Sequence, residues 1–473
     1  MRTVIQDAHE DSRLTTFLQK ELSEINRQGN HARQFKAKRL CGSQRNLKTS
    51  PAVFLLTNGA KSYYYGLNRC NSSWGCPTCT PRRMAQYGTR IAAMIDALKA
   101  KYKQSACMIT FTVPHRKWMN INDIYQILQD TWREYSRQYR TSRTKKYTLK
   151  KNVDEDKRAV GKKGETREYE IKLSNTSYAA LREKFQIVHN VRVYEFTWGP
   201  NGWHPHIHAL FWIPEHLFDQ LNLSWSKTLS DEWLNTCKKI MYKHYVKKNP
   251  DNAEKIKGIV DELFNERQYK HRAVYFSADN NGKILRVKSS HYISGWGGDM
   301  EVCNERKMKR AAEGHYSPLQ ILQEAYKHRK DKDATEKNYW LNLYLDFIKV
   351  TFGHRRVQFS KSGLNKIAAD WMQTNTWQEV LKKKFTDAGT DTRKVVYWFC
   401  DEQWQQISFH HLSTKLLDLS LLPDAKEQIE HLLLEYDIQW TTTKHWFEKF
   451  LENITSIDYF DGLGKKLLMQ SAG

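Results

Sequence analysis

Three histidines alternate along one strand-like stretch of the chain, Trp203–Ile213, which reads WHPHIHALFWI. Alternate residues of a β-strand point to opposite faces of a sheet. His206 and His208 therefore share one face, while Ile207 and Phe211 lie on the other and are expected to enter a core. The pattern predicts a sheet with one apolar face and one face that carries imidazoles.

A second strand, Val191–Thr197, precedes this one and is joined to it through GPNG at 199–202, a strong hairpin signal. A two-residue loop at Asn-Gly places Glu195 opposite His208, and a four-residue loop places it opposite His206. Both registers bring the carboxylate to the histidine face. A three-residue loop with a bulge would instead take it off that face.

Two imidazoles and one carboxylate on one sheet face make a metal site with open positions. Such a site suits a divalent ion that also holds a phosphate oxygen. We expect Mg²⁺ or Mn²⁺ at His206, His208 and Glu195, with His204, beside Pro205 and near the turn, on the rim. The alternative is that the histidines form only local hydrogen bonds and bind no ion.

The charge of the chain points to a polyanionic partner. Among 473 residues there are 76 lysines and arginines and 52 acids, a formal net charge of +24. Such a surface most often faces nucleic acid, although a basic enzyme without that partner is the alternative. No stretch is typical of a signal peptide or reaches the roughly 20 apolar residues that span a bilayer. We therefore expect no membrane association and a cytoplasmic location, where thiols stay reduced.

The cysteines in the first part of the chain have the spacing of a zinc site. Cys70, Cys76 and Cys79 are arranged C-x5-C-x2-C, and Cys41 is the natural fourth ligand. Four thiolates in a reduced compartment indicate a closed, structural Zn²⁺ site. The alternative is a set of unrelated free thiols.

Four ordered stretches resemble the HUH endonucleases, and more narrowly the replication initiators of rolling-circle plasmids and related phages and transposons. The resemblance covers about residues 35–325. It rests on the cysteine-rich segment with CGSQ and RCNSSWGCPTCTPRR, on MITFTVPH at Met108–His115, on HPHIHALF at His204–Phe211, and on HYISGWGGD at His291–Asp299 followed by GHYSPLQIL.

The resemblance selects Tyr292 among 24 tyrosines as the nucleophile. A phenol with an ordinary pKa near 10 needs a neighbouring cation or metal to attack a phosphate. Relatives commonly carry lysine three residues after the tyrosine, where this chain has Gly295, and Lys288 can take its place. Asp299 and Glu301 are weak candidates for activating water in the closing step.

Several basic residues are candidates for contact with DNA phosphates. Arg82 and Arg83 follow the cysteines at a helix N-terminus, a favourable position for a phosphate. A later basic run adds Lys307, Lys309 and Arg310.

These patterns predict an α+β fold with a central antiparallel sheet of HUH type. Helices are expected on one face of the sheet, with the metal and the tyrosine on the other. The predicted domains are an N-terminal arm with the zinc segment (1–100), the endonuclease domain with a basic insertion at 141–175 (101–312), and a mainly helical C-terminal domain (313–473).

The resemblance implies a rolling-circle replication initiator that nicks and joins one DNA strand through a 5′-phosphotyrosine. Its partners would be origin DNA, single-stranded or cruciform, and a host helicase and polymerase. A host helicase is expected because the chain has no Walker motif for ATP-driven unwinding. The alternatives are a single-strand DNA transposase, a non-catalytic zinc-stabilised DNA-binding protein, and hydrolysis by activated water.

Overall fold

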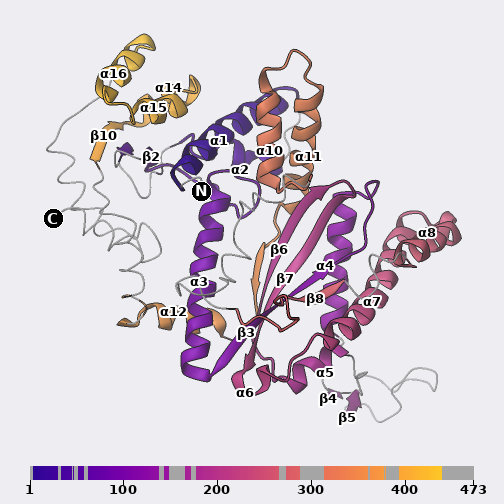
Figure 1. Cartoon of the computed structure of the whole chain (residues 1–473). Helices are drawn as coiled ribbons and strands as arrows, with labels where there is room; N and C mark the ends of the chain where they lie inside the picture. The colour runs from indigo at the N-terminus through magenta and orange to yellow at the C-terminus, as the bar shows by residue number, and fades with distance from the viewer. Residues whose placement is uncertain are drawn as a thin grey trace.

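A five-stranded antiparallel sheet forms the centre of the protein, in the order β8-β3-β7-β6-β9 (Figure 1). The computed structural model describes residues 4–29, 33–44, 46, 52–57, 62–137, 143–148, 166–171, 177–265, 273–287, 314–360, 363–375, 377, 379 and 394–438. The strands of this sheet are β3 (Gln104–Thr112), β6 (Asn190–Gly199), β7 (Gly202–Pro214), β8 (Val274–Phe276) and β9 (Val357–Phe359). The predicted α+β class with a central antiparallel sheet is confirmed.

The hairpin of β6 and β7 has one of the two registers that keep the carboxylate on the histidine face. Glu195 pairs with His206, which is the register predicted for a four-residue loop. The pairing extends one step further, to Gly199 and Gly202, so the turn itself has only the two residues between these glycines. Gly202 has a φ of 88°, which favours glycine at this position.

The apolar face of the sheet is covered as the alternation predicts. Ile207 and Phe211 are fully buried and pack against helices α4 (Ile121–Arg137) and α7 (Ser224–Lys248). Apolar residues recur along α4 at helical spacing, which gives that helix one continuous face for the sheet. This layer is the largest core of the described residues.

The histidine face is also covered in part, and the expectation of helices on one face alone is wrong. Helices α3 (Cys79–Tyr102) and α12 (Leu364–Met372) lie on this side of the sheet (Figure 1). They pack on Leu210 and Trp212 of β7, which continue the histidine face away from the hairpin. Burial of these side chains removes apolar area from water, so the aliphatic half of the face takes its own helical layer.

A second, three-stranded sheet joins early and late parts of the chain in the order β10-β1-β2. Its strands are β1 (Val53–Thr57), β2 (Ser62–Tyr65) and β10 (Lys394–Phe399). The sheet shares a core with the late helices α14 (Asp401–Phe409), α15 (Ser413–Leu419) and α16 (Ala425–Glu435). The predicted domain boundaries stay a prediction, but strands 53–57 and 394–399 belong to one sheet.

The remaining elements surround these two sheets. Strands β4 (Arg143–Thr148) and β5 (Thr166–Ile171), inside the predicted basic insertion, pair with each other in a separate sheet. The other helices are α1 (Val4–Arg27), α2 (Arg33–Arg39), α5 (Ser177–Lys184), α6 (Glu215–Phe218), α8 (Ala253–Asn265), α10 (Pro318–Lys327) and α11 (Thr335–Thr351). Within the described part of the chain, no helix combines the length and apolarity that a membrane crossing requires.

Candidate metal centres

Glu195, His206 and His208 meet on the sheet face near the hairpin. The Oε2 atom of Glu195 lies 3.1 Å from His206 Nε2 and 2.8 Å from His208 Nε2, and the two Nε2 atoms are 3.1 Å apart. Both imidazoles are 4% exposed. The structure thus brings the three predicted ligands together, and the group could hold a metal ion.

The separations among these three atoms can be compared with the distances between ligands of one metal ion. Ligands at about 2.1 Å from Mg²⁺ and at right angles to each other lie about 3.0 Å apart. A tetrahedral site with ligands at about 2.05 Å would separate them by about 3.3 Å. The observed 2.8–3.1 Å is compatible with three ligands of one ion and is also the distance of direct hydrogen bonds among the three groups.

Thr110 on the neighbouring strand orients one of the imidazoles. Thr110 pairs with His208 across the two strands, and its Oγ1 lies 3.0 Å from His208 Nδ1. With Nε2 as a metal ligand, Nδ1 carries the proton and donates it to this hydroxyl. This contact was not predicted, although the alternation of Thr110 and Thr112 in MITFT indicates that both hydroxyls lie on one face of the sheet.

The charge state of Glu195 fits a ligand. Burial opposes ionisation of this carboxyl, but the neighbouring His206 and His208 hold its pKa well below the usual range. A divalent cation could replace the imidazole protons that stabilise this carboxylate. The residues therefore fit a divalent ion by charge as well as by distance.

A row of imidazole rings extends from this group toward the hairpin tip. The ring of His204, half-buried and outside the triad, lies 5.3 Å from that of His206 and 4.7 Å from that of His115. His115 belongs to the loop after β3, which abuts the hairpin, since a Cβ on Gly202 would lie 3.0 Å from the Cα of Lys117. His115 was part of the MITFTVPH resemblance without a predicted role.

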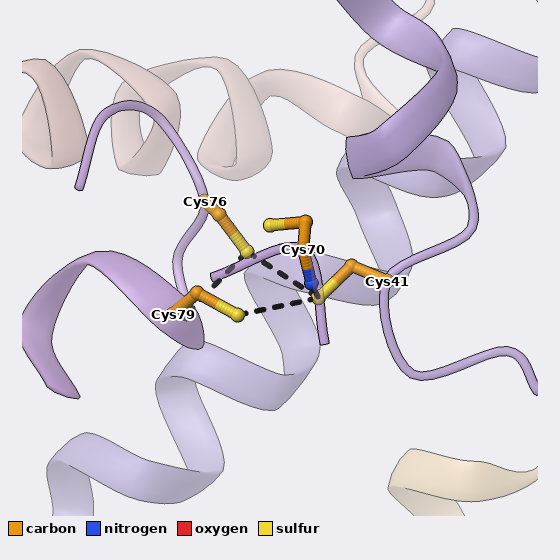
Figure 2. A group of neighbouring side chains, drawn as sticks. All are labelled: Cys41, Cys70, Cys76 and Cys79. Carbon is orange, nitrogen blue, oxygen red and sulfur yellow. Dashed lines mark hydrogen bonds between the residues drawn. The ribbon is translucent and has the colours of Figure 1, made fainter. Parts of the chain in front are cut away.

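The four predicted cysteines also converge (Figure 2). Their sulfur atoms all lie within 4.8 Å of one another, and Cys41 Sγ is 3.5 Å from Cys79 Sγ and 3.7 Å from Cys76 Sγ. Tetrahedral zinc with bonds of about 2.3 Å would place its sulfurs about 3.8 Å apart. The group could hold a metal ion, and its geometry is close to that of a zinc site.

Mutual hydrogen bonds among the four thiols lower the pKa of some and raise the pKa of others, with Cys70 and Cys76 raised. Hydrogen bonds from Cys70 and Cys76 hold the pKa of the Cys41 thiol well below its ordinary value. Lys38 is 5% exposed beside the cluster; burial lowers its pKa, while the four cysteines favour its charged form. A closed site of four thiolates around Zn²⁺ carries a net charge of −2, of which a charged Lys38 would offset one unit.

The structure places some of the predicted DNA-contact residues and not others. Arg82 and Arg83 lie near the start of α3, where Arg83 donates to Gln86 Oε1 at 2.9 Å and stands over the ring of Tyr87. The other predicted residues lie outside the described part of the chain; these are Tyr292, Lys288, Gly295, Asp299, Glu301, Lys307, Lys309 and Arg310.

Comparison with known proteins gives one partial similarity. A curated protein of Streptomyces lividans named "Protein rep" is 25% identical to the chain over 284 residues. The aligned part is 58% of this chain and 56% of that protein, so the chain spans little more than half of its curated relative. No family model matches the chain, and no solved structure matches it.

Proposed function

We propose that this protein initiates rolling-circle replication by nicking one strand of origin DNA and staying joined to its 5′ end. The observation that carries the proposal is the convergence of Glu195, His206 and His208 at 2.8–3.1 Å on one sheet face. These residues would hold Mg²⁺ or Mn²⁺, which polarises the scissile phosphate when bound. Zn²⁺ in the cysteine cluster would have a structural role.

Tyr292 is the proposed nucleophile. Its phenol oxygen attacks the scissile phosphorus, the bond from phosphorus to the 3′ oxygen breaks, and a proton passes to that oxygen. The products are a free 3′-OH and a 5′-phosphotyrosine. A later 3′-OH attacks the same phosphorus, releases the phenol and rejoins the strand. Lys288 is proposed to stabilise the phosphate or phenolate charge.

Val287, the last described residue before Tyr292 in the sequence, is bonded to the strand that neighbours β7. Val287 donates its N–H to the carbonyl of Ala106 on β3 at 2.8 Å. His208 is paired with Thr110, four residues along β3 from Ala106, or about 13 Å. Val287 thus holds the chain on β3, the strand whose Thr110 contacts His208.

Two further observations support a DNA substrate. The net charge of +24 favours phosphate binding, and the similar Streptomyces protein is named "Protein rep". The proposed partners are single-stranded or cruciform origin DNA, and a host helicase and polymerase for unwinding and synthesis.

A second candidate function is origin binding without nicking, by a zinc-stabilised DNA-binding protein. The observation that favours it is Gly295, which stands where the resembling family commonly has lysine. The cysteine cluster is necessary for this function, and a reactive tyrosine is not.

A covalent-adduct assay tests the proposal. The full-length protein is mixed with Mn²⁺ and labelled single-stranded DNA from the region flanking its gene, then run on a denaturing gel. We expect a shifted protein–DNA band that is absent with Tyr292→Phe and retained with Tyr339→Phe, an exposed tyrosine on α11.

Each other outcome contradicts the proposal in a defined way. Cleavage that persists in Tyr292→Phe identifies water or another tyrosine as the nucleophile. Specific binding without cleavage in the wild type supports the binding-only function.

Glu195→Gln should reduce adduct formation in Mn²⁺ strongly, since it removes an anionic ligand from the metal group.

A further inference from the structure

Tyr275 lies in register with the metal group, on the same face of the sheet. It is paired with Thr110 on β3, and Thr110 is paired with His208 on β7. Residues paired directly across antiparallel strands point to the same side. Tyr275, Thr110 and His208 therefore form one row across the sheet, and the hydroxyl of Thr110 contacts His208 within that row.

The neighbours of Tyr275 confirm which way it faces. Val274 and Phe276 are 0% and 5% exposed and enter the core below the sheet, on the side of α7. Tyr275 points to the opposite side and is 45% exposed. β8 is an edge strand of the described sheet. The histidine face therefore presents an aromatic ring to solvent at this edge.

The spacing brings this ring close to where the DNA strand would pass. Adjacent strands are about 4.8 Å apart, so the backbones at Tyr275 and His208 are separated by about 10 Å. When the scissile phosphate is bound at the metal group, the neighbouring nucleotides of the DNA lie over the adjoining β-strands. An exposed aromatic ring at that distance suits a base, because every base has a π-face that stacks irrespective of sequence.

We propose that Tyr275 is a stacking platform for a base adjacent to the scissile phosphate. The inference rests on the proposed function in that the ligand is single-stranded DNA. It assigns to Tyr275 the positioning of the strand and no part in bond breaking. The ring, rather than the hydroxyl, is the group that binds.

The experiment measures binding in the absence of cleavage. Fluorescence anisotropy with a labelled single-stranded origin oligonucleotide and full-length protein, without added Mg²⁺ or Mn²⁺, gives the dissociation constant. We expect Tyr275→Ala to weaken binding about 5- to 150-fold, the range for loss of one stacked base, and Tyr275→Phe to bind within about twofold of wild type. Tyr102→Ala, at an exposed tyrosine at the end of α3, is the matched control.

A second variant and a second probe separate stacking from a general loss of structure. Tyr275→Leu keeps apolar bulk without a π-face and should bind as weakly as Tyr275→Ala, with an unchanged circular dichroism spectrum. An oligonucleotide with 2-aminopurine beside the nick site should be quenched by wild type and Tyr275→Phe, and not by Tyr275→Leu.

The outcomes that overturn this inference differ from those that overturn the proposed function. If Tyr275→Ala and Tyr275→Leu bind like Tyr102→Ala, the platform does not exist, whether or not the wild type nicks DNA. If Tyr275→Phe loses as much affinity as alanine, the hydroxyl is the contact and stacking is wrong. A wild type that binds through Tyr275 but forms no adduct contradicts only the nicking function.

Discussion

Replacement of Thr110 by valine should weaken metal binding without changing a ligand. Thr110 is 1% exposed, and its Oγ1 lies 3.0 Å from His208 Nδ1. Valine has nearly the same shape, so the change removes the hydroxyl that accepts from His208 Nδ1. An unsatisfied buried donor costs about 1–3 kcal/mol. Loss of a hydrogen bond that orients a metal ligand typically lowers affinity about 10- to 100-fold, or about 1.4–2.7 kcal/mol.

Mn²⁺ titration followed by the electron paramagnetic resonance of the free ion measures this change. Thr112→Val is the matched control, because Thr112 lies two residues along the same strand, faces the same side and contacts the carbonyl of Ala273 instead of an imidazole. We expect a 10- to 100-fold weaker Mn²⁺ affinity for Thr110→Val and little change for Thr112→Val. Equal affinities for the two variants would refute the orienting role of Thr110.

Three other perturbations test separate parts of the structure. Cys79→Ser should reduce the zinc content measured by mass spectrometry from about one ion per chain to nearly none and lower the Tm, whereas Cys237→Ala, in the main core, should keep its zinc. Burial lowers the pKa of His115, so the folded protein resists a proton that the unfolded chain takes up near pH 6.5, and stability falls as the pH drops below that value. His115→Phe should therefore show a shallower decrease of Tm between about pH 7.5 and 5.5, and an unchanged slope would contradict this. Gly202→Ala should lower the Tm more than Gly314→Ala, because both glycines have positive φ but only Gly202 abuts a neighbouring loop, and equal losses would mean that this contact is not tight.

The metal face was predictable because its signals are local. The period of two in residues 203–213 assigns each side chain to a face, and the GPNG turn restricts the register to a few choices. The structure selects the register that pairs Glu195 with His206. The cysteine cluster was predictable for the same reason, since three of its four residues lie within ten positions of one another.

The parts that were missed depend on contacts between distant segments. The apolar stripe of α3 indicates that the helix is buried, but it does not tell which face of the sheet receives it. Strand β9 has three residues, too few to show a period. Lys38 approaches the cysteines only through the packing of α2, and no spacing in the sequence predicts a cation there.

The small sheet constrains how this protein can be made. Val53 pairs with Phe399, so β1 cannot pair with β10 until most of the chain has been synthesised. During that interval one edge of β1 offers unpaired N–H and C=O groups to any strand nearby. Pairing across so many residues is slow. The small sheet is therefore the part of the described fold that is completed late in synthesis, and its first strand is open to non-native pairing until then.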